Sequence, residues 1–171
     1  MRSLLLSAGL LTASLYATAP LRALKAFYIT SAAMAPTLQR NERILVDRQA
    51  YAKQPPQRGD IVFFYPPYNA VSPNAQNAPF VSRVVGLPGE KIEVKGGKVF
   101  IDGTALTENY TTHPPDYVLE ATAIPEGQYF TLSDNRSSAY DSHAWGTVPE
   151  DHMIGKITWR YWPLNHWGTV N

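Results

Sequence analysis

Residues 3–21 form a run of 19 residues without a charged side chain, and this run limits what the chain can fold into. Leu, Ala, Ser and Thr dominate the run, and positive charges flank it on both sides. As an α-helix it would be roughly 28 Å long, about the thickness of the hydrocarbon core of a bilayer. We therefore predict a single transmembrane anchor over residues 1–25, followed by one folded domain over residues 26–171.

Two alternatives compete with the anchor, a cleavable signal peptide and a buried core helix. Ala17 and Ala19 match the A-x-A pattern of a signal peptide cleavage site. Pro20 would follow the cut, where proline is a poor substrate, so we favour the anchor. The flanking positive charges balance one another and do not specify which side of the membrane the domain occupies.

Composition excludes several classes of function. The chain has 171 residues, of which 44% are apolar and 17% are charged, enough for one domain with a sizeable core. With a net charge of +1, the chain lacks the strong positive potential that binding of nucleic acid would need. Cysteine is absent, which excludes disulfides and thiolate metal sites, and the four histidines lack ligand spacing. We expect no metal and no cofactor.

Beyond the anchor, the pattern predicts a mainly β domain. Short apolar runs bounded by turn residues predict strands at 43–48, 61–65, 80–85, 91–94, 99–101, 128–132 and 153–162. Gly96 and Gly97 predict a tight hairpin between two of these strands. We expect an exposed loop at 69–79 and irregular structure over 104–123. Repeats, heptads and long amphipathic helical patterns are missing from the sequence, which favours a β fold.

Residues 29–38 lie where the predicted anchor meets the domain and read I-T-S-A-A-M-A-P-T-L. This pattern resembles the nucleophile box of type I signal peptidases, the membrane-bound serine endopeptidases that remove signal peptides from exported proteins. In that family a serine directly precedes the methionine, whereas this chain has Ala33 there. A methyl group cannot act as a nucleophile. The resemblance also implies that Ser31 and the backbone amide of Ala33 form an oxyanion hole.

Two further boxes resemble the same family. Residues 80–89 read F-V-S-R-V-V-G-L-P-G, with Ser82 where the family has its general-base lysine. A serine hydroxyl is not a base near neutral pH. Residues 133–143 read S-D-N-R-S-S-A-Y-D-S-H. In this third box Ala139 replaces the serine that orients the lysine, Ser133 replaces an opening glycine, and His143 replaces a final arginine.

The resemblance implies a domain of antiparallel β-sheets with the remaining box residues in supporting roles. Asp134, Arg136 and Asp141 would form a structural ion-pair cluster. The pockets for small substrate side chains would be lined by Ile29, Met34, Leu38, Phe80 and Val81. The alternative for these apolar residues is simple packing in the core.

The ending of the third box, His-x-Trp-Gly at residues 143–146, is similar to the cyanobacterial and plastid branch of the family. The resemblance therefore implies that the domain lies on the exported side of the membrane, in the periplasm or the thylakoid lumen.

Three hypotheses follow for the function. The first, which we favour, is a natural pseudoenzyme that acts as a binding or structural subunit of a membrane complex, with another membrane protein or a signal-peptide-like segment as partner. The second is a signal peptidase I inactivated by engineering. The third is a hydrolase with relocated chemistry, in which Ser31 or Ser82 reacts. His143 and Asp141 would then complete a triad, although nothing in the sequence places these groups within hydrogen-bond reach.

Overall fold

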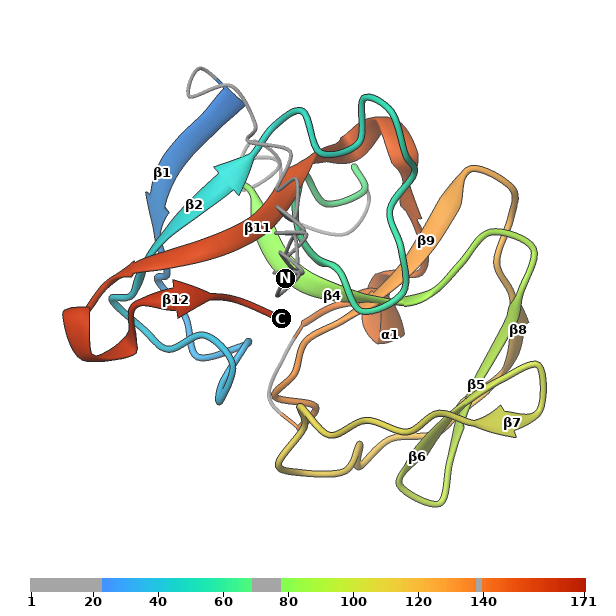
Figure 1. Ribbon diagram of the computed structural model, residues 1–171. Helices are drawn as coiled ribbons and strands as arrows, with labels where there is room; N and C mark the ends of the chain where they lie inside the picture. The colour runs from blue at the N-terminus through green and yellow to red at the C-terminus, as the bar shows by residue number, and fades with distance from the viewer. Residues whose placement is uncertain (1–22, 69–77, 138–139) are drawn as a thin grey trace, which may run out of the picture.

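The computed structural model describes residues 23–68, 78–137 and 140–171. These residues form a mainly β structure built from two antiparallel sheets (Figure 1). Within the described ranges, no helix is long and apolar enough to cross a membrane. The helix predicted over residues 3–21 lies outside those ranges. Leu24 and Lys25, which we assigned to the anchor, belong to the first strand.

The larger sheet has eight strands in the order β1-β2-β11-β3-β4-β9-β10, with β12 paired to β11. The strands are β1 (Leu24–Tyr28), β2 (Arg43–Asp47), β3 (Ile61–Phe64), β4 (Phe80–Gly86), β9 (Gln128–Leu132), β10 (Val148–Pro149), β11 (Met153–Trp162) and β12 (Gly168–Thr169). The five strands predicted in this part of the chain are confirmed, with ends shifted by at most one residue. The long strand β11 holds β2 on one side and β3 on the other.

The smaller sheet has four strands in the order β7-β6-β5-β8. They are β5 (Lys91–Lys95), β6 (Lys98–Ile101), β7 (Thr104–Ala105) and β8 (Leu119–Ala123). The predicted hairpin is confirmed, because Gly96 and Gly97 both have positive φ, 55° and 72°. The expectation of irregular structure over 104–123 was wrong for β7 and β8. Strand β8 lies at a sheet edge with four of its five residues exposed, so it lacks the apolar alternation that marks a strand.

Within the described ranges the helical elements are short: α1 (Ser142–Trp145) and the 3₁₀ turns η3 (Glu150–His152) and η4 (Leu164–His166). Asp141 caps α1, and its side chain accepts a hydrogen bond from the backbone N–H of His143 at 3.1 Å. Ser142 ties the helix to β9, because its Oγ accepts from the backbone N–H of Thr131 at 3.1 Å. The third sequence box therefore ends in a structure fixed against the large sheet.

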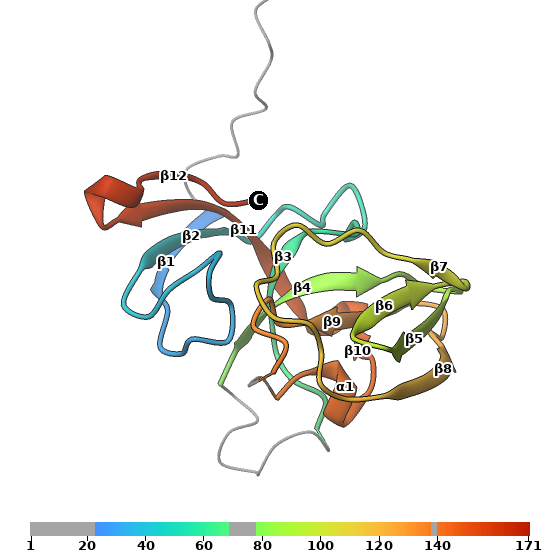
Figure 2. The same cartoon turned by 90° about the horizontal axis from the view of Figure 1, so that it is seen from below.

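Apolar clusters lie on both faces of the larger sheet. Ile61 and Phe63 of β3 belong to one cluster, and Val62 and Phe64 belong to another, so the whole strand is buried. The two sheets lie side by side in Figure 2. A further apolar cluster joins them and consists of Val85, Ile92, Val94, Val99, Ile101, Ile124, Phe130 and Leu132. Because this cluster draws residues from β4, β5, β6 and β9, burial of apolar surface holds the smaller sheet in place.

Candidate active site

Residues 29–38 form an ordered loop between β1 and β2. Ile29 extends the strand pairing, since its backbone N–H donates to the carbonyl of Glu42 at 2.8 Å and its carbonyl accepts from Asn41 at 2.7 Å. At the other end of the loop, the backbone N–H of Leu38 donates to the carbonyl of Met34 at 2.8 Å, closing a helical turn. Position 33 is therefore held in a defined turn.

A buried carboxylate holds the exit of this loop. Glu42 is 2% exposed and accepts hydrogen bonds from the backbone of Gln39, from Arg160 and from His166, at 3.0, 3.1 and 3.0 Å. Arg160 also donates to the carbonyl of Thr37 at 3.0 Å. The loop is thus anchored to β11 by charge-assisted hydrogen bonds, which are stronger than neutral ones.

Ser31 and Ala33, the two predicted oxyanion-hole donors, lie beside each other. The backbone N–H of Ala33 points to the Oγ of Ser31 at 3.4 Å, near the upper limit for a hydrogen bond. Ser31 is exposed and Ala33 is half-buried. In this arrangement the Ala33 N–H donates to Ser31, and it would have to turn away from the serine to stabilise negative charge on a carbonyl oxygen. The side chain of Ala33 adds no reactive group.

Ser82 lies on β4, opposite Val62 of β3, and is 1% exposed. Its Oγ is 3.5 Å from the Oγ of Ser133, which is also buried. Among the described residues, these two hydroxyls hydrogen-bond only with each other, and neither contacts an amine or an imidazole. The pair therefore has no group that takes up a proton near neutral pH.

Residues 133–135 link the three sequence boxes. The backbone N–H of Asn135 donates to the carbonyl of Ala33 at 2.9 Å, and its side-chain amide donates to the carbonyl of Ala32 at 3.3 Å. Two residues earlier, Ser133 meets Ser82. The structure therefore gathers positions 31, 33 and 82 around one loop. Ala139, the remaining predicted position of this group, lies outside the described residues.

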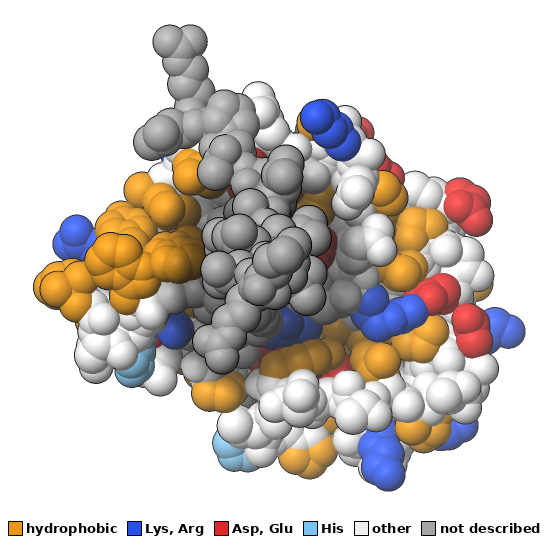
Figure 3. Space-filling model, viewed as in Figure 1, with side chains coloured by type: hydrophobic (Ala, Val, Ile, Leu, Met, Phe, Trp, Pro, Cys, Tyr) orange, Lys and Arg blue, Asp and Glu red, His pale blue; other side chains and the backbone are white. Residues whose placement is uncertain are grey.

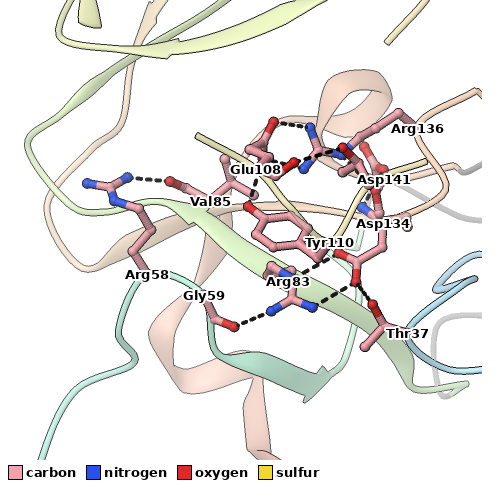
Figure 4. Close-up of polar contacts among 12 residues, drawn as sticks. Thr37, Arg58, Gly59, Arg83, Val85, Glu108, Tyr110, Asp134, Arg136 and Asp141 are labelled. Atoms are coloured by element: carbon pink, nitrogen blue, oxygen red, sulfur yellow. Dashed lines mark hydrogen bonds and ion pairs between the residues drawn. The ribbon is translucent and has the colours of Figure 1, made fainter. Parts of the chain in front are cut away.

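A buried ion pair joins Asp134 of this loop to Arg83 of β4 (Figure 4). Arg83 donates from Nε and Nη2 to the two carboxylate oxygens of Asp134 at 2.9 and 2.7 Å. Thr37 donates its hydroxyl proton to the same carboxylate. Arg83 also donates to the carbonyl of Gly59 at 2.8 Å and stacks 4.0 Å from the ring of Tyr110. Every charge in this group has a partner, as burial requires.

A second buried ion pair joins Arg136 to Glu108 (Figure 4). Two guanidinium nitrogens of Arg136 donate to the two oxygens of Glu108 at 2.9 and 2.6 Å, and its Nε donates to the carbonyl of Ser133 at 2.9 Å. Tyr110 donates its hydroxyl proton to Glu108 at 2.7 Å, and burial together with the Glu108 charge raises the pKa of Tyr110. Glu108 and Tyr110 were not predicted from the sequence, because they lie in a segment without apolar periodicity.

Asp141 binds the backbone N–H of Ser133, whose carbonyl is bound by Arg136. Its carboxylate accepts from the backbone N–H of Ser133 at 2.9 Å and from Nδ1 of His143 at 2.8 Å. The His143 ring stacks on Tyr117 with centroids 4.2 Å apart. The hydrogen bond to Asp141 raises the pKa of His143, although partial burial opposes that change. No hydrogen bond joins His143 to Ser31 or Ser82 within the described residues, so the relocated triad finds no support in this geometry.

The predicted structural residues Asp134, Arg136 and Asp141 are all buried, but they form separate pairs with Arg83, Glu108 and His143. The predicted pocket residues divide into two groups. Ile29, Met34 and Leu38 are buried in one apolar cluster, which Val81 also contacts. Phe80 packs against Trp145 at 5.3 Å and is half-buried, as is Val81. Phe80 and Val81 thus have surface to offer a ligand, whereas the other three are core residues.

A cleft of about 730 Å³ lies beside Arg83 and Thr37. It is lined by Thr37, Arg58, Asp60, Arg83, Tyr110 and Lys156, among others. Its cations are neutralised, since Lys156 contacts Asp60 at 2.6 Å and Arg58 contacts Glu90. Neither Ala33 nor Ser82 borders it, so the cleft is separate from the positions that the three boxes identify.

Comparison with known families and sequences identifies relatives of one kind. The family model described as signal peptidase, peptidase S26, matches residues 2–162. The chain is 44% identical over 147 residues to signal peptidase I of Leptolyngbya laminosa, covering 85% of this chain and 72% of the relative. It is 42% identical over 144 residues to probable signal peptidase I-1 of Synechocystis sp., and the match covers 84% of this chain and 74% of that relative. Thylakoidal processing peptidase 1 of Arabidopsis thaliana is 34% identical, and the match covers 79% of this chain and 41% of that relative.

A solved structure agrees with the sequence relatives. The crystal structure of a signal peptidase I from Enterococcus faecalis superposes with a TM-score of 0.50 and 32% sequence identity. The match covers 61% of this chain and 98% of that one. The mainly β fold expected from the sequence resemblance is therefore the fold of a signal peptidase I.

Removal of Glu108 tests the buried ion pair. We expect Glu108→Ala to lower the free energy of unfolding by about 3–5 kcal/mol, because Arg136 would keep a buried, unpaired charge. The matched control is Glu93→Ala, which removes a carboxylate from a surface pair with Lys95 and should cost about 0–1 kcal/mol. Urea denaturation of both variants measures the difference. Equal losses in the two variants would show that the Arg136–Glu108 pair does not stabilise the fold.

The raised pKa of His143 makes its contribution to stability depend on pH. The folded state binds this proton more tightly than the unfolded state, so the stabilisation is full below the ordinary histidine pKa of about 6.5. It is lost as the pH rises through the higher pKa of the folded state. We expect His143→Phe, which keeps the ring stacked on Tyr117, to lose more stability at pH 5.5 than at pH 8.5. A loss that is the same at both pH values would contradict this assignment.

Proposed function

Because this chain belongs to the signal peptidase family, peptidase S26, we propose that it is a catalytically inactive member of that family. In this proposal Ala33, Ser82 and Ala139 replace the nucleophile, the general base and the serine that orients the base. The domain keeps the family fold and acts as a binding or structural subunit at a membrane. Its partner is a signal-peptide-like segment or another membrane protein.

The observation that carries the proposal is the chemistry of positions 33 and 82. Covalent peptide hydrolysis needs a nucleophile and a group that takes its proton. Ala33 offers a methyl group, and the hydroxyl of Ser82 is buried against that of Ser133. Ser31 is exposed, but no described lysine or histidine hydrogen-bonds to it. Ser31 thus offers a hydroxyl with no base beside it, and this supports the proposed loss of catalysis.

The binding part of the proposal rests on what surrounds these positions. The hydroxyl of Ser31 is exposed, and the backbone N–H of Ala33 makes only a long hydrogen bond of 3.4 Å to the Oγ of Ser31, which a carbonyl oxygen can replace. Phe80 and Val81 at the start of β4 are half-buried, and Val81 packs against the apolar cluster that contains Met34 of the 29–38 loop. An extended peptide that lies along a strand would use such backbone donors for affinity and apolar contacts for selectivity.

An aromatic patch supports attachment of the domain to a membrane surface. It consists of Tyr28, Trp162, Leu164 and Trp167, with exposed fractions between 48% and 67%. Strand register places Tyr28 and Trp162 on either side of Arg43. Hydrophobic side chains gather over this end of the molecule, near β12 (Figure 3). Tryptophan and tyrosine beside a cation are typical of the membrane interface. The exported-side location, in the periplasm or thylakoid lumen, is part of the same proposal.

A cleavage assay tests the loss of catalysis. The purified full chain is incubated with a preprotein that carries an A-x-A site, beside the Leptolyngbya laminosa signal peptidase I as positive control. We expect cleavage at least about 10³-fold slower than by the control, because nucleophile and base are both absent. The same mixture is then tested for uncleaved preprotein that is retained on the immobilised protein. Retention should fall when the A-x-A alanines are replaced by large residues.

Cleavage by the unmodified protein at a rate near that of the control would overturn the inactive assignment. Ser31→Ala and Ser82→Ala would then identify which hydroxyl reacts. Absence of both cleavage and retention would leave the structural subunit as the supported role and reject the peptide-binding one.

Lipid contact by the aromatic patch is tested with tryptophan fluorescence. The full chain is reconstituted in vesicles that contain brominated lipids, which quench nearby indoles. One variant keeps Trp167 alone, with the other three tryptophans changed to Phe, and a second keeps Trp145 alone. We expect strong quenching of Trp167 and weak quenching of Trp145, because α1 and β12 lie apart in both views (Figures 1 and 2). Equal quenching would reject the patch as the membrane-facing surface.

A further inference from the structure

A pocket of about 370 Å³ lies at one corner of the larger sheet, beside the aromatic patch. It is lined by Ala26, Phe27, Tyr28, Asn41, Arg43 and Tyr161. Strand register brings these residues together, since Tyr28 of β1 pairs with Arg43 of β2, and Arg43 pairs with Trp162 of β11. The pocket therefore shares Tyr28 with the aromatic patch and adjoins Trp162.

The polar side chains of this pocket can all donate hydrogen bonds, and no carboxylate lines it. Within the described ranges, the side chains of Tyr28, Asn41, Arg43 and Tyr161 have no hydrogen bond and no ion pair. Asn41 uses its backbone N–H to bind the carbonyl of Ile29, which leaves its amide group free. The Arg43 guanidinium is exposed and lies 5.8 Å from the ring centroid of Trp162. An arginine surrounded only by further donors is suited to an anion.

The cleft beside Arg83 and Thr37 differs from this pocket in its charges. Asp60 lines that cleft and pairs with Lys156, and Arg58 pairs with Glu90. An anion in the cleft would have to displace carboxylates that already hold these cations. The smaller pocket asks for no such exchange, so we place an anion there.

The strands that build the pocket also form the positively charged end of the molecule. Residues 23–53 contain five basic and two acidic side chains, whereas the other described residues contain eight basic and twelve acidic ones. Of the two acidic side chains, Glu42 is buried and Asp47 accepts a backbone hydrogen bond. Basic side chains border the hydrophobic ones at this end (Figure 3). A negatively charged surface would attract this end and repel the rest.

We propose that the pocket binds the phosphate group of an anionic phospholipid, with Arg43 as its main contact and Asn41 and the two tyrosines as further donors. The inference rests on the proposed attachment of the aromatic patch to a membrane, and it adds the class of lipid. Tryptophan and tyrosine lie at the depth of the lipid headgroups. Arg43, between Tyr28 and Trp162, would lie at that depth as well. Its planar guanidinium can bind two phosphate oxygens at once.

Lipid selectivity is measured with Trp162 as the reporter. The full chain, with the other three tryptophans changed to Phe, is reconstituted in phosphatidylcholine vesicles that contain a minor share of phosphatidylglycerol. Two preparations have the same composition, with bromine on phosphatidylglycerol in one and on phosphatidylcholine in the other. The ratio of quenching gives the local enrichment of each lipid. We expect phosphatidylglycerol to be enriched about fivefold over its bulk share, the effect of one basic residue at an anionic surface.

Variants separate the pocket from the general positive charge of this end. Arg43→Gln should lower the enrichment to less than about twofold. Asn41→Gly should lower it in part, because glycine keeps the positive φ of 70° at this position and removes only the amide group. The matched control is Arg48→Gln, which removes an exposed arginine of the same segment that does not line the pocket. It should leave the enrichment near that of the unmodified protein. Equal Tm values by circular dichroism verify that the variants fold.

Each contrary result has a distinct meaning. Equal loss of enrichment in Arg43→Gln and Arg48→Gln would indicate diffuse attraction and overturn the pocket. Quenching in proportion to bulk composition would overturn the lipid class and leave the attachment of the patch in place. Absence of quenching by either lipid would reject the attachment and the pocket together. Loss of enrichment when inorganic phosphate is added would indicate a small-anion site and overturn the assignment to lipid. Cleavage of preprotein by the unmodified protein would reject the inactive assignment alone.

Discussion

The buried pair between Arg83 and Asp134 is the interaction at which separate parts of the chain converge. It joins strand β4 to the loop that follows β9, and through Thr37 it reaches the 29–38 loop. The side chains are 3% and 0% exposed, so both charges have left water. Such burial is tolerated only when the remaining donors and acceptors are also satisfied. The contacts of Arg83 with Gly59 and Tyr110 meet that condition and thereby fix two more segments.

This scaffold does not depend on the side chains at positions 33 and 82. Asn135 binds the backbone of residue 33, and the two ion pairs use Arg83, Asp134, Arg136 and Glu108. Side chains at the two positions can therefore change without loss of the charged network. The 29–38 loop therefore keeps its support from Asn135 and Asp134 whichever side chains stand at 33 and 82.

Much of the fold could be predicted because apolar alternation is a local property. The strands with a buried face, such as β2 and β5, were predicted, and the turn at Gly96 and Gly97 followed from the need for positive φ. Strand β8 was missed because its edge position leaves it without such a face. Asp134, Arg136 and Asp141 were predicted as one cluster, but the partners of the first two, Arg83 and Glu108, lie 51 and 28 residues away. No local pattern indicates which distant charge each will meet.

The sequence by itself determined the chemistry available at positions 33 and 82, because a methyl group and a hydroxyl keep their reactivity class in any fold. It also determined the family, through three boxes in the right order. Only the tertiary structure decided that the Ser82 hydroxyl meets Ser133 and that Glu108 neutralises Arg136. These contacts follow from burial, which brings together groups far apart in the chain and requires each polar atom to find a partner there. Sequence spacing carries no information about that outcome.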